Sequence, residues 1–191
     1  PSTAVVTEVI PLSSSHAGAG TVTVDGAFDD DFLDRLDALW RKLPLAPKEK
    51  ASPTERAYYA DDTGWVTQRL DAAVAAAALP GAAVSMPHMR FLWYPEVGGS
   101  LPQHVDLPRK DIAGRRSMYT FLLYLQDCAR GGETEFLECL EGDAALAPSG
   151  GVAPGRREVV ARVQPRRGRL LLMPHACPHS AAPVFDVPKV L

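Results

Sequence analysis

The chain has 191 residues, of which 46% are hydrophobic and 23% are charged, a composition that is ordinary for one sizeable globular domain. Its net charge of −3 gives no overall reason to expect nucleic acid or an anionic membrane as a partner, and no apolar run approaches the roughly twenty residues that span a bilayer. Three cysteines without tight spacing argue against a disulfide framework, and the start of the sequence shows no signal segment, so we expect a cytoplasmic protein.

The first part of the chain combines short strand patterns with two helical patterns. Residues 4–10 and 21–24 are rich in β-branched side chains and predict strands. Residues 29–43 predict a helix, because apolar side chains recur at helical spacing behind an acidic start. Residues 67–79 are rich in alanine and predict a second helix. The polar stretch between the two helices, residues 48–56, predicts a loop.

From residue 86 onward, short apolar runs alternate with Pro/Gly turns and no long helical pattern interrupts them. The runs are residues 89–94, 117–125, 134–137, 159–163, 170–173 and 183–187. Strands without crossover helices pair antiparallel, so the sequence predicts a mainly β, α+β fold, a sandwich or jelly roll with the helices packed outside. We expect a single domain over 1–191, with a support region at 1–85, a β core at 86–191 and an extended loop at 141–155.

The motif His104-Val-Asp106, followed by a second histidine at His179, is typical of a metal site. Two imidazoles and one carboxylate are the ligand set of non-haem Fe(II) centres that keep open coordination positions. Alternate residues of a strand point to the same face, so His104 and Asp106 can bind one ion together. Lys189, ten residues after His179, indicates that an anionic group binds beside the metal.

The segment from position 174 to 179 offers an alternative candidate for the third metal ligand. His175 competes with His179, and the two together have the i, i+4 spacing of a helical zinc pair. Pro174 and Pro178 argue against a helix at this point. Cys177 lies between the histidines and has the chemistry of a soft ligand, although a buried free thiol is the commoner case.

The motifs around these residues resemble those of the Fe(II)/2-oxoglutarate-dependent dioxygenases, and within them the prolyl 4-hydroxylase group. That group carries a tyrosine and a glycine before H-x-D, a G-G-x-T-x-F-like segment, and a final H-x-x-x-P-V with a lysine ten residues past the histidine. The matching positions are, in order, Tyr94, Gly98, His104, Asp106, Gly131, Gly132, Thr134, Phe136, His179, Pro183, Val184 and Lys189. The resemblance covers about half of the chain, residues 86–191.

The resemblance implies a double-stranded β-helix, which is a jelly roll, with Fe(II) bound by His104, Asp106 and His179. It further implies 2-oxoglutarate as the co-substrate and O2 as the oxidant, with ascorbate as an additional reductant. The spacing to the P-V pair and to the final lysine favours His179 over His175 as the third ligand. We then expect His175 to line the pocket or to support the ligands.

The same resemblance assigns residues to the co-substrate. Lys189 is expected to pair with the distal carboxylate of 2-oxoglutarate. Tyr94 and Tyr124 stand where the family places hydroxyls that bind the co-substrate, and Thr134 is expected to line the pocket or support it. Where the group usually has a glycine two residues before the lysine, this chain has Val187.

Three functions follow from this reading of the sequence. The leading expectation is hydroxylation of a C–H bond, with a peptidyl prolyl residue as the target and a peptide or protein as the partner. The first alternative is the same chemistry on a free amino acid or another small molecule. The second alternative is a jelly-roll module that binds metal and catalyses no oxidation.

Overall fold

The computed structural model describes residues 4–48, 53–81, 83–111, 113–140, 158–186 and 188–191, so the extended loop expected at 141–155 lies outside the described residues. The helices are α1 (Asp30–Trp40) and α2 (Thr67–Ala76). The strands are β1 (Val5–Ile10), β2 (Thr21–Asp25), β3 (Glu55–Ala60), β4 (His88–Tyr94), β5 (Leu101–His104), β6 (Tyr119–Leu123), β7 (Thr134–Leu137), β8 (Val159–Val163), β9 (Leu170–Pro174), β10 (His179–Ala181) and β11 (Lys189–Val190). Neither helix in the described ranges is long and apolar enough to cross a membrane.

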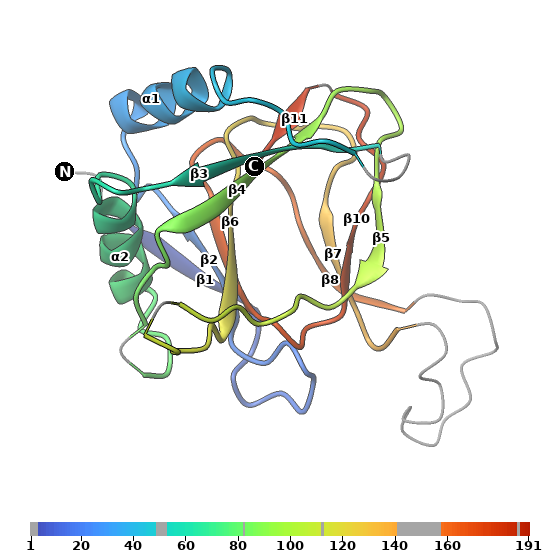
Figure 1. Ribbon diagram of the computed structural model, residues 1–191. Helices are drawn as coiled ribbons and strands as arrows, with labels where there is room; N and C mark the ends of the chain where they lie inside the picture. The colour runs from blue at the N-terminus through green and yellow to red at the C-terminus, as the bar shows by residue number, and fades with distance from the viewer. Residues whose placement is uncertain (1–3, 49–52, 82, 112, 141–157, 187) are drawn as a thin grey trace.

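The strands pair antiparallel in three sheets, with orders β1-β2-β9-β6, β5-β10-β7-β8 and β11-β4-β3. In Figure 1 the first sheet stands in the middle of the molecule, the second stands to its right, and β3 and β4 cross above them. Both helices lie at the left of the view, on the side away from the second sheet. The predicted mainly β jelly roll with helices packed outside is therefore confirmed.

The two helices cover one apolar cluster through the faces that their sequences predict. Phe32, Leu33 and Leu36 of α1 are buried, and the carboxylate of Asp29 caps the helix by accepting the N–H of Phe32 at 2.9 Å. The α2 N-terminus is capped from outside the helix, because the buried carboxylate of Asp61 accepts N–H bonds from the first residues of that helix. Both helices thus pack their apolar faces against β2, β4 and β9.

Strand β9 separates two apolar clusters. Leu170 and Leu172 belong to the cluster under the helices, whereas Leu171 and Met173 belong to the cluster between the sheets. Because side chains alternate across a strand, an uninterrupted apolar run is required at a strand that is covered on both faces. The run of residues 170–173 in the sequence is this strand, and it ends close to the residues that form the site described below.

Two sequence predictions are wrong. Residues 55 and 56 were assigned to a loop but begin β3, whose six residues all pair with β4; the charged and exposed residues of this edge strand hide its alternation. The sequence predicts a strand over residues 183–187, but residues 183–186 lie between β10 and β11, and residue 187 is outside the described residues. Val184 bonds instead with Gly98 and Gly99 of a loop, and Pro183 has no N–H to offer a ladder. The helices also end three residues earlier than predicted.

Candidate metal centre and co-substrate pocket

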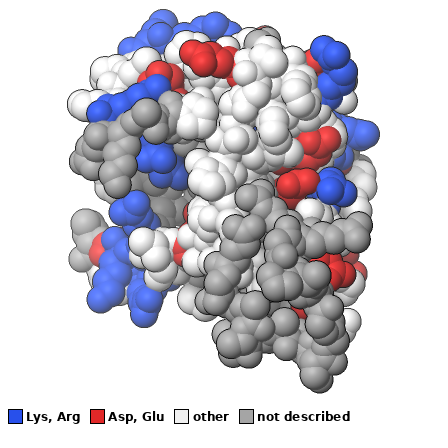
Figure 2. All heavy atoms as spheres, turned by 90° about the vertical axis from the view of Figure 1, so that its right-hand side faces the viewer, with Lys and Arg blue, Asp and Glu red and all other residues white. Residues whose placement is uncertain are grey.

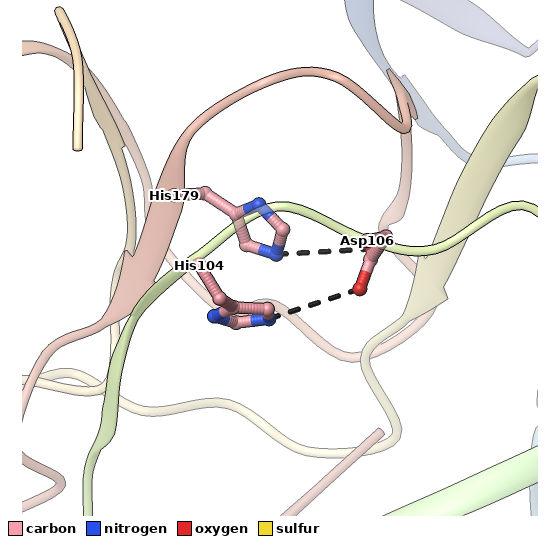
Figure 3. A group of neighbouring side chains, drawn as sticks. All are labelled: His104, Asp106 and His179. Atoms are coloured by element: carbon pink, nitrogen blue, oxygen red, sulfur yellow. Dashed lines mark ion pairs between the residues drawn. The ribbon is translucent and has the colours of Figure 1, made fainter. Parts of the chain in front are cut away.

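Strand pairing brings the two histidines of the predicted metal site together. His104 is the last residue of β5 and His179 the first of β10, and the two are direct partners in the antiparallel register. Side chains of such partners share a face, and the centroids of the two rings lie 4.2 Å apart. Asp106 lies two residues beyond the end of β5, not on the strand itself, yet its carboxylate turns toward both imidazoles (Figure 3).

The three side chains are close enough to share one ion. Nε2 of His104 lies 3.7 Å from Oδ1 of Asp106, and Nε2 of His179 lies 3.9 Å from Oδ2. One potential ligand atom from each residue lies within 4.8 Å of the others, and this is the one such group among the residues that the structure describes. A metal ion with bonds of about 2 Å fits between atoms at such separations.

Hydrogen bonds set the imidazoles in the orientation that a metal requires. Nδ1 of His104 bonds to the carbonyl of Pro102 at 2.8 Å, and Nδ1 of His179 bonds to the carbonyl of Cys177 at 2.9 Å. A carbonyl only accepts, so both Nδ1 atoms carry the proton and both Nε2 atoms offer a lone pair. Burial also lowers the pKa of His179, which keeps that ring neutral. The donor set therefore fits a divalent transition metal.

Lys189 lies at the other end of the site and is almost completely buried, with 1% of its surface exposed. It is the β11 partner of Tyr94 on β4, and its Nζ lies 4.7 Å from the centre of the Tyr94 ring. Burial lowers the pKa of its ammonium group to about 8. Nζ donates to the carbonyl of Gly132 at 2.6 Å, but no described carboxylate lies in ion-pair range. A buried ammonium that lacks a carboxylate partner among the described residues has the chemistry to accept an anionic ligand.

The Gly131-Gly132 pair allows the backbone to come close enough for the carbonyl of Gly132 to contact Lys189. Both glycines have φ near +70°, a region that other residues rarely adopt. A Cβ on Gly131 would also lie 2.1 Å from the carbonyl oxygen of Pro183. Only glycine thus allows the segment before β7 to pack against the segment before β11, and the G-G element of the sequence motif has a structural cause.

A single pocket joins the two ends. Its polar lining includes the three candidate ligands, Thr134 and Lys189. Its apolar lining includes leucines of β4, β5 and β6 and the leucine at position 191. The other lining residues are Arg90, Leu92, Tyr94, Leu101, Thr120, Leu122, Ser180, Ala181 and Leu191. An elongated ligand with an anionic end near Lys189 and metal-binding atoms at its other end matches this arrangement.

The two tyrosines of the sequence prediction occupy different places. Tyr94 lines the pocket, and burial raises the pKa of its hydroxyl to about 12, so it stays protonated as a donor. Tyr124 does not line the pocket; it is fully buried between the sheets, and its hydroxyl bonds to Thr134 at 2.6 Å. Thr134 is therefore the residue through which Tyr124 reaches the pocket.

The structure separates His175 from the candidate metal ligands. Its Nδ1 bonds to Thr120 at 2.9 Å and its Nε2 to Ser117 at 2.7 Å, so neither nitrogen is free for an ion. β9 ends at Pro174 and β10 begins at His179, which rules out the helical zinc pair. Cys177 is buried, and burial raises the pKa of its thiol to about 12, so it is a thiol and not a thiolate ligand.

Sequence reasoning missed Thr120, Ser117 and Arg90. The hydroxyl of Thr120 donates to Oδ2 of Asp106 at 2.6 Å, a contact between segments that only the fold brings together. Arg90 carried a usable signal, because it precedes Tyr94 by four residues on β4, and residues 90, 92 and 94 of a strand share one face. Arg90 is exposed, and its side chain makes no hydrogen bond or ion pair with any residue that the structure describes.

Comparisons with known proteins agree with this geometry. Residues 89–190 match the sequence profile of the 2OG-Fe(II) oxygenase superfamily. The fold is similar to that of a prolyl-4-hydroxylase from Pseudomonas putida, with a TM-score of 0.59 and 19% identity over 92% of this chain and 89% of that one. It is similar to a viral collagen prolyl hydroxylase from Paramecium bursaria Chlorella virus-1, solved with 2-oxoglutarate, with a TM-score of 0.58 and 14% identity over 93% and 95% of the chains.

A third similar structure was solved with a small molecule bound. HygX from Streptomyces hygroscopicus, solved with nickel, 2-oxoglutarate and hygromycin B, has a TM-score of 0.59 and 16% identity over 91% of this chain and 80% of that one. At such identities the structural likeness establishes the fold and leaves the substrate open. No curated protein sequence matches the chain at a significant level.

Proposed function

Because the chain belongs to the 2OG-Fe(II) oxygenase superfamily, we propose that it is a 2-oxoglutarate-dependent dioxygenase that hydroxylates a C–H bond, with a peptidyl prolyl residue as the favoured target. The observation that carries the proposal is one pocket that joins His104, Asp106 and His179 to the buried ammonium group of Lys189. A module that only binds metal would need the three candidate ligands but would not need a buried ammonium group in the same pocket.

His104, Asp106 and His179 are the residues that would hold Fe(II). One potential ligand atom of each residue lies within 4.8 Å of the others. Three protein ligands of this kind would leave coordination positions for a bidentate co-substrate and for O2. Bound Fe(II) and 2-oxoglutarate supply the coupled chemistry in which substrate R–H, 2-oxoglutarate and O2 yield R–OH, succinate and CO2. The protein residues fix the imidazole tautomers, orient the carboxylate and exclude water from the far end of the pocket.

Lys189 would bind the distal carboxylate of 2-oxoglutarate. Its ammonium group is buried and lacks a carboxylate partner among the described residues, so a bound carboxylate would supply the missing counter-charge in a dry environment. Tyr94 and Thr134 line the same end and offer hydroxyls to that carboxylate. Tyr124 holds Thr134 in place from behind. Ascorbate remains an expected additional reductant.

The choice of a prolyl target rests on the sequence motifs and on the similar folds of two prolyl hydroxylases. A small-molecule substrate is the second candidate, and the fold likeness to HygX with hygromycin B favours it to a similar degree. The charge near the pocket limits the range of substrates expected for both candidate functions. Lys and Arg side chains lie at both the left and the right edge of the face seen in Figure 2, with Asp and Glu side chains among them. Arg90 lines the pocket and is exposed. Substrates with acidic groups should therefore bind better than cationic ones.

The cytoplasm remains our expected compartment. All three cysteines, Cys128, Cys139 and Cys177, are free in the structure. Free thiols in this number favour a reducing environment. The measurement of thiol oxidation in protein purified from its native source would test this expectation.

A succinate-release screen tests the proposed reaction. The protein is incubated aerobically with Fe(II), 2-oxoglutarate and ascorbate, and a panel of proline-containing peptides is compared with free amino acids. We expect succinate in excess of the substrate-free rate with at least one peptide, and its loss in His104→Ala. Stimulation by free amino acids alone would transfer the assignment to a small-molecule oxygenase. A wild-type protein that releases no succinate with or without substrate would support the non-catalytic metal-binding module instead.

A further inference from the structure

Asp106 is anchored differently from the two histidines beside it. His104 and His179 sit on paired strands, whereas Asp106 lies past the end of β5. Its backbone N–H donates to the carbonyl of His175 at 3.1 Å, and the N–H of His175 donates to the carbonyl of Met118 at 3.1 Å. The carboxylate of Asp106 is therefore attached through the loop after β9, and side-chain contacts must fix its rotation.

A directed chain of hydrogen bonds supplies those contacts. The hydroxyl of Thr120 donates to Oδ2 of Asp106 at 2.6 Å, since a carboxylate only accepts. That proton is then committed, so the 2.9 Å contact between Thr120 and Nδ1 of His175 must be donated by the imidazole. In a neutral ring Nε2 accepts, and the hydroxyl of Ser117 at 2.7 Å is its donor. The N–H of Arg109 closes the chain by donating to Ser117 at 2.8 Å.

Two members of this hydrogen-bond chain lie on or directly after paired strands. Thr120 lies on β6 and is the register partner of Met173 on β9, which is completely buried. His175 follows β9 directly. Thr120 donates to Oδ2, which also lies 3.9 Å from Nε2 of His179. Oδ1, 3.7 Å from Nε2 of His104, is therefore the oxygen that keeps both of its lone-pair positions clear of this hydroxyl.

We propose that Thr120 and His175 are positioning residues that make Asp106 present a single oxygen, Oδ1, to the metal. The inference rests on the proposed function and adds the reason why this carboxylate leaves coordination positions open. If Oδ2 were free, the carboxylate could rotate and bind the ion through both oxygens, which would remove a position that the co-substrate or O2 needs. Partners of metal ligands typically contribute roughly 10- to 100-fold to metal affinity.

The test is a titration with Mn(II) alone, followed through the signal of free Mn(II) in electron paramagnetic resonance. Thr120→Val removes the hydroxyl at nearly constant volume, and Thr120→Ser keeps it. We expect Mn(II) to bind Thr120→Val roughly 10- to 100-fold more weakly than wild type, and Thr120→Ser within about threefold of wild type. With saturating Mn(II), Thr120→Val should also bind 2-oxoglutarate more weakly than wild type, because a carboxylate that binds through both oxygens takes a position that the co-substrate needs. Thr120→Ser should bind 2-oxoglutarate as wild type does.

A second pair keeps the test independent of the folding of Thr120→Val. His175→Asn retains an N–H donor near the position of Nδ1, whereas His175→Leu removes both ring nitrogens, and only His175→Leu should weaken Mn(II) binding strongly. Wild-type affinity in the folded Thr120→Val or His175→Leu protein, as judged by its thermal unfolding, would overturn the inference. If wild type binds Mn(II) no better than Asp106→Ala, the proposed metal site itself fails, and the two failures are thereby distinguished.

Discussion

The two ends of the pocket achieve their binding chemistry by opposite means. Two of the three candidate metal ligands are partly exposed, with 32% of the His104 side chain and 22% of the Asp106 side chain open to solvent, whereas His179 is buried. Lys189, Tyr94 and Thr134 are exposed by no more than 2%. Hydrogen bonds to protein atoms orient the groups at the first end. At the second end, the buried ammonium group of Lys189 has no carboxylate partner in the part of the chain that the structure describes. Metal affinity should therefore depend on the ligands and their orientation at the first end. Affinity for 2-oxoglutarate should depend on the positive charge at the second end.

The largest effect should come from Asp106→Ala at the exposed end. It removes a whole ligand, so metal affinity should fall by more than the roughly 100-fold upper range for partners of ligands, and succinate release should vanish. Anaerobic Mn(II) titration and the succinate assay measure both. The matched control is Asp111→Ala, which removes a carboxylate of the following loop that pairs with exposed Arg115. Equal losses in the two variants would show that the loop, and not the ligand, matters.

Lys189→Met at the buried end should spare the metal and weaken the co-substrate. Loss of one partner from a buried ion pair costs about 2–5 kcal/mol, which is roughly a 30-fold or greater rise in Kd for 2-oxoglutarate. Calorimetry on the Mn(II)-loaded protein gives this Kd, and thermal unfolding checks that the uncharged side chain is tolerated. Lys110→Met, on the exposed loop, should bind 2-oxoglutarate as wild type does. Unchanged Kd in Lys189→Met would refute the role of the ammonium group.

The same end should be sensitive to pH. Burial lowers the pKa of Lys189 to about 8, so the free protein loses this positive charge as the pH rises through 8. The dianionic co-substrate binds the protonated form, hence its affinity should be constant below pH 8 and fall up to about tenfold per pH unit above it. Calorimetry of Mn(II)-loaded protein between pH 6.5 and 9.5 tests the sign. In Lys189→Met the decline should disappear; a decline that persists would belong to another group.

The smallest effects should distinguish the two tyrosines. Tyr94→Phe removes a hydroxyl that lines the pocket, so Kd for 2-oxoglutarate should rise a few-fold, by about 0.5–1.5 kcal/mol. Tyr124→Phe removes the bond to buried Thr134, so the free energy of unfolding should fall by about 1–3 kcal/mol, with a smaller change in Kd. Urea unfolding and calorimetry on both variants measure the difference. The reverse assignment of effects would place Tyr124 in direct contact with the co-substrate.

The sequence predicted those parts of the fold and site that depend on local pattern. The helical spacing of Phe32, Leu33 and Leu36 and the apolar run of β9 identify elements that are buried on the expected faces. The spacing of His104, Asp106 and His179 anticipated a group that the fold brings together, although their role as ligands stays a prediction.

The parts that the sequence did not predict depend on contacts between distant segments. β3 is an edge strand with charged, exposed residues, and its pairing with β4 rather than its own pattern defines it. Thr120 of β6 bonds to Asp106, which follows β5, and to His175, which follows β9. These contacts join three segments that are distant in the sequence, so no motif spacing predicts them. The family resemblance places Tyr124 at the co-substrate, but Tyr124 directly follows β6 and its hydroxyl bonds to Thr134 of β7.

The most direct test of the central claim is the visible absorption spectrum of the protein with Fe(II) and 2-oxoglutarate under anaerobic conditions. If His104, Asp106 and His179 hold the iron beside the co-substrate, wild type should show a weak, broad charge-transfer band that appears only when both additions are present. The band should be absent in His179→Ala and should require more 2-oxoglutarate in Lys189→Met. No band in the wild-type protein, or the same band in His179→Ala, would contradict the account.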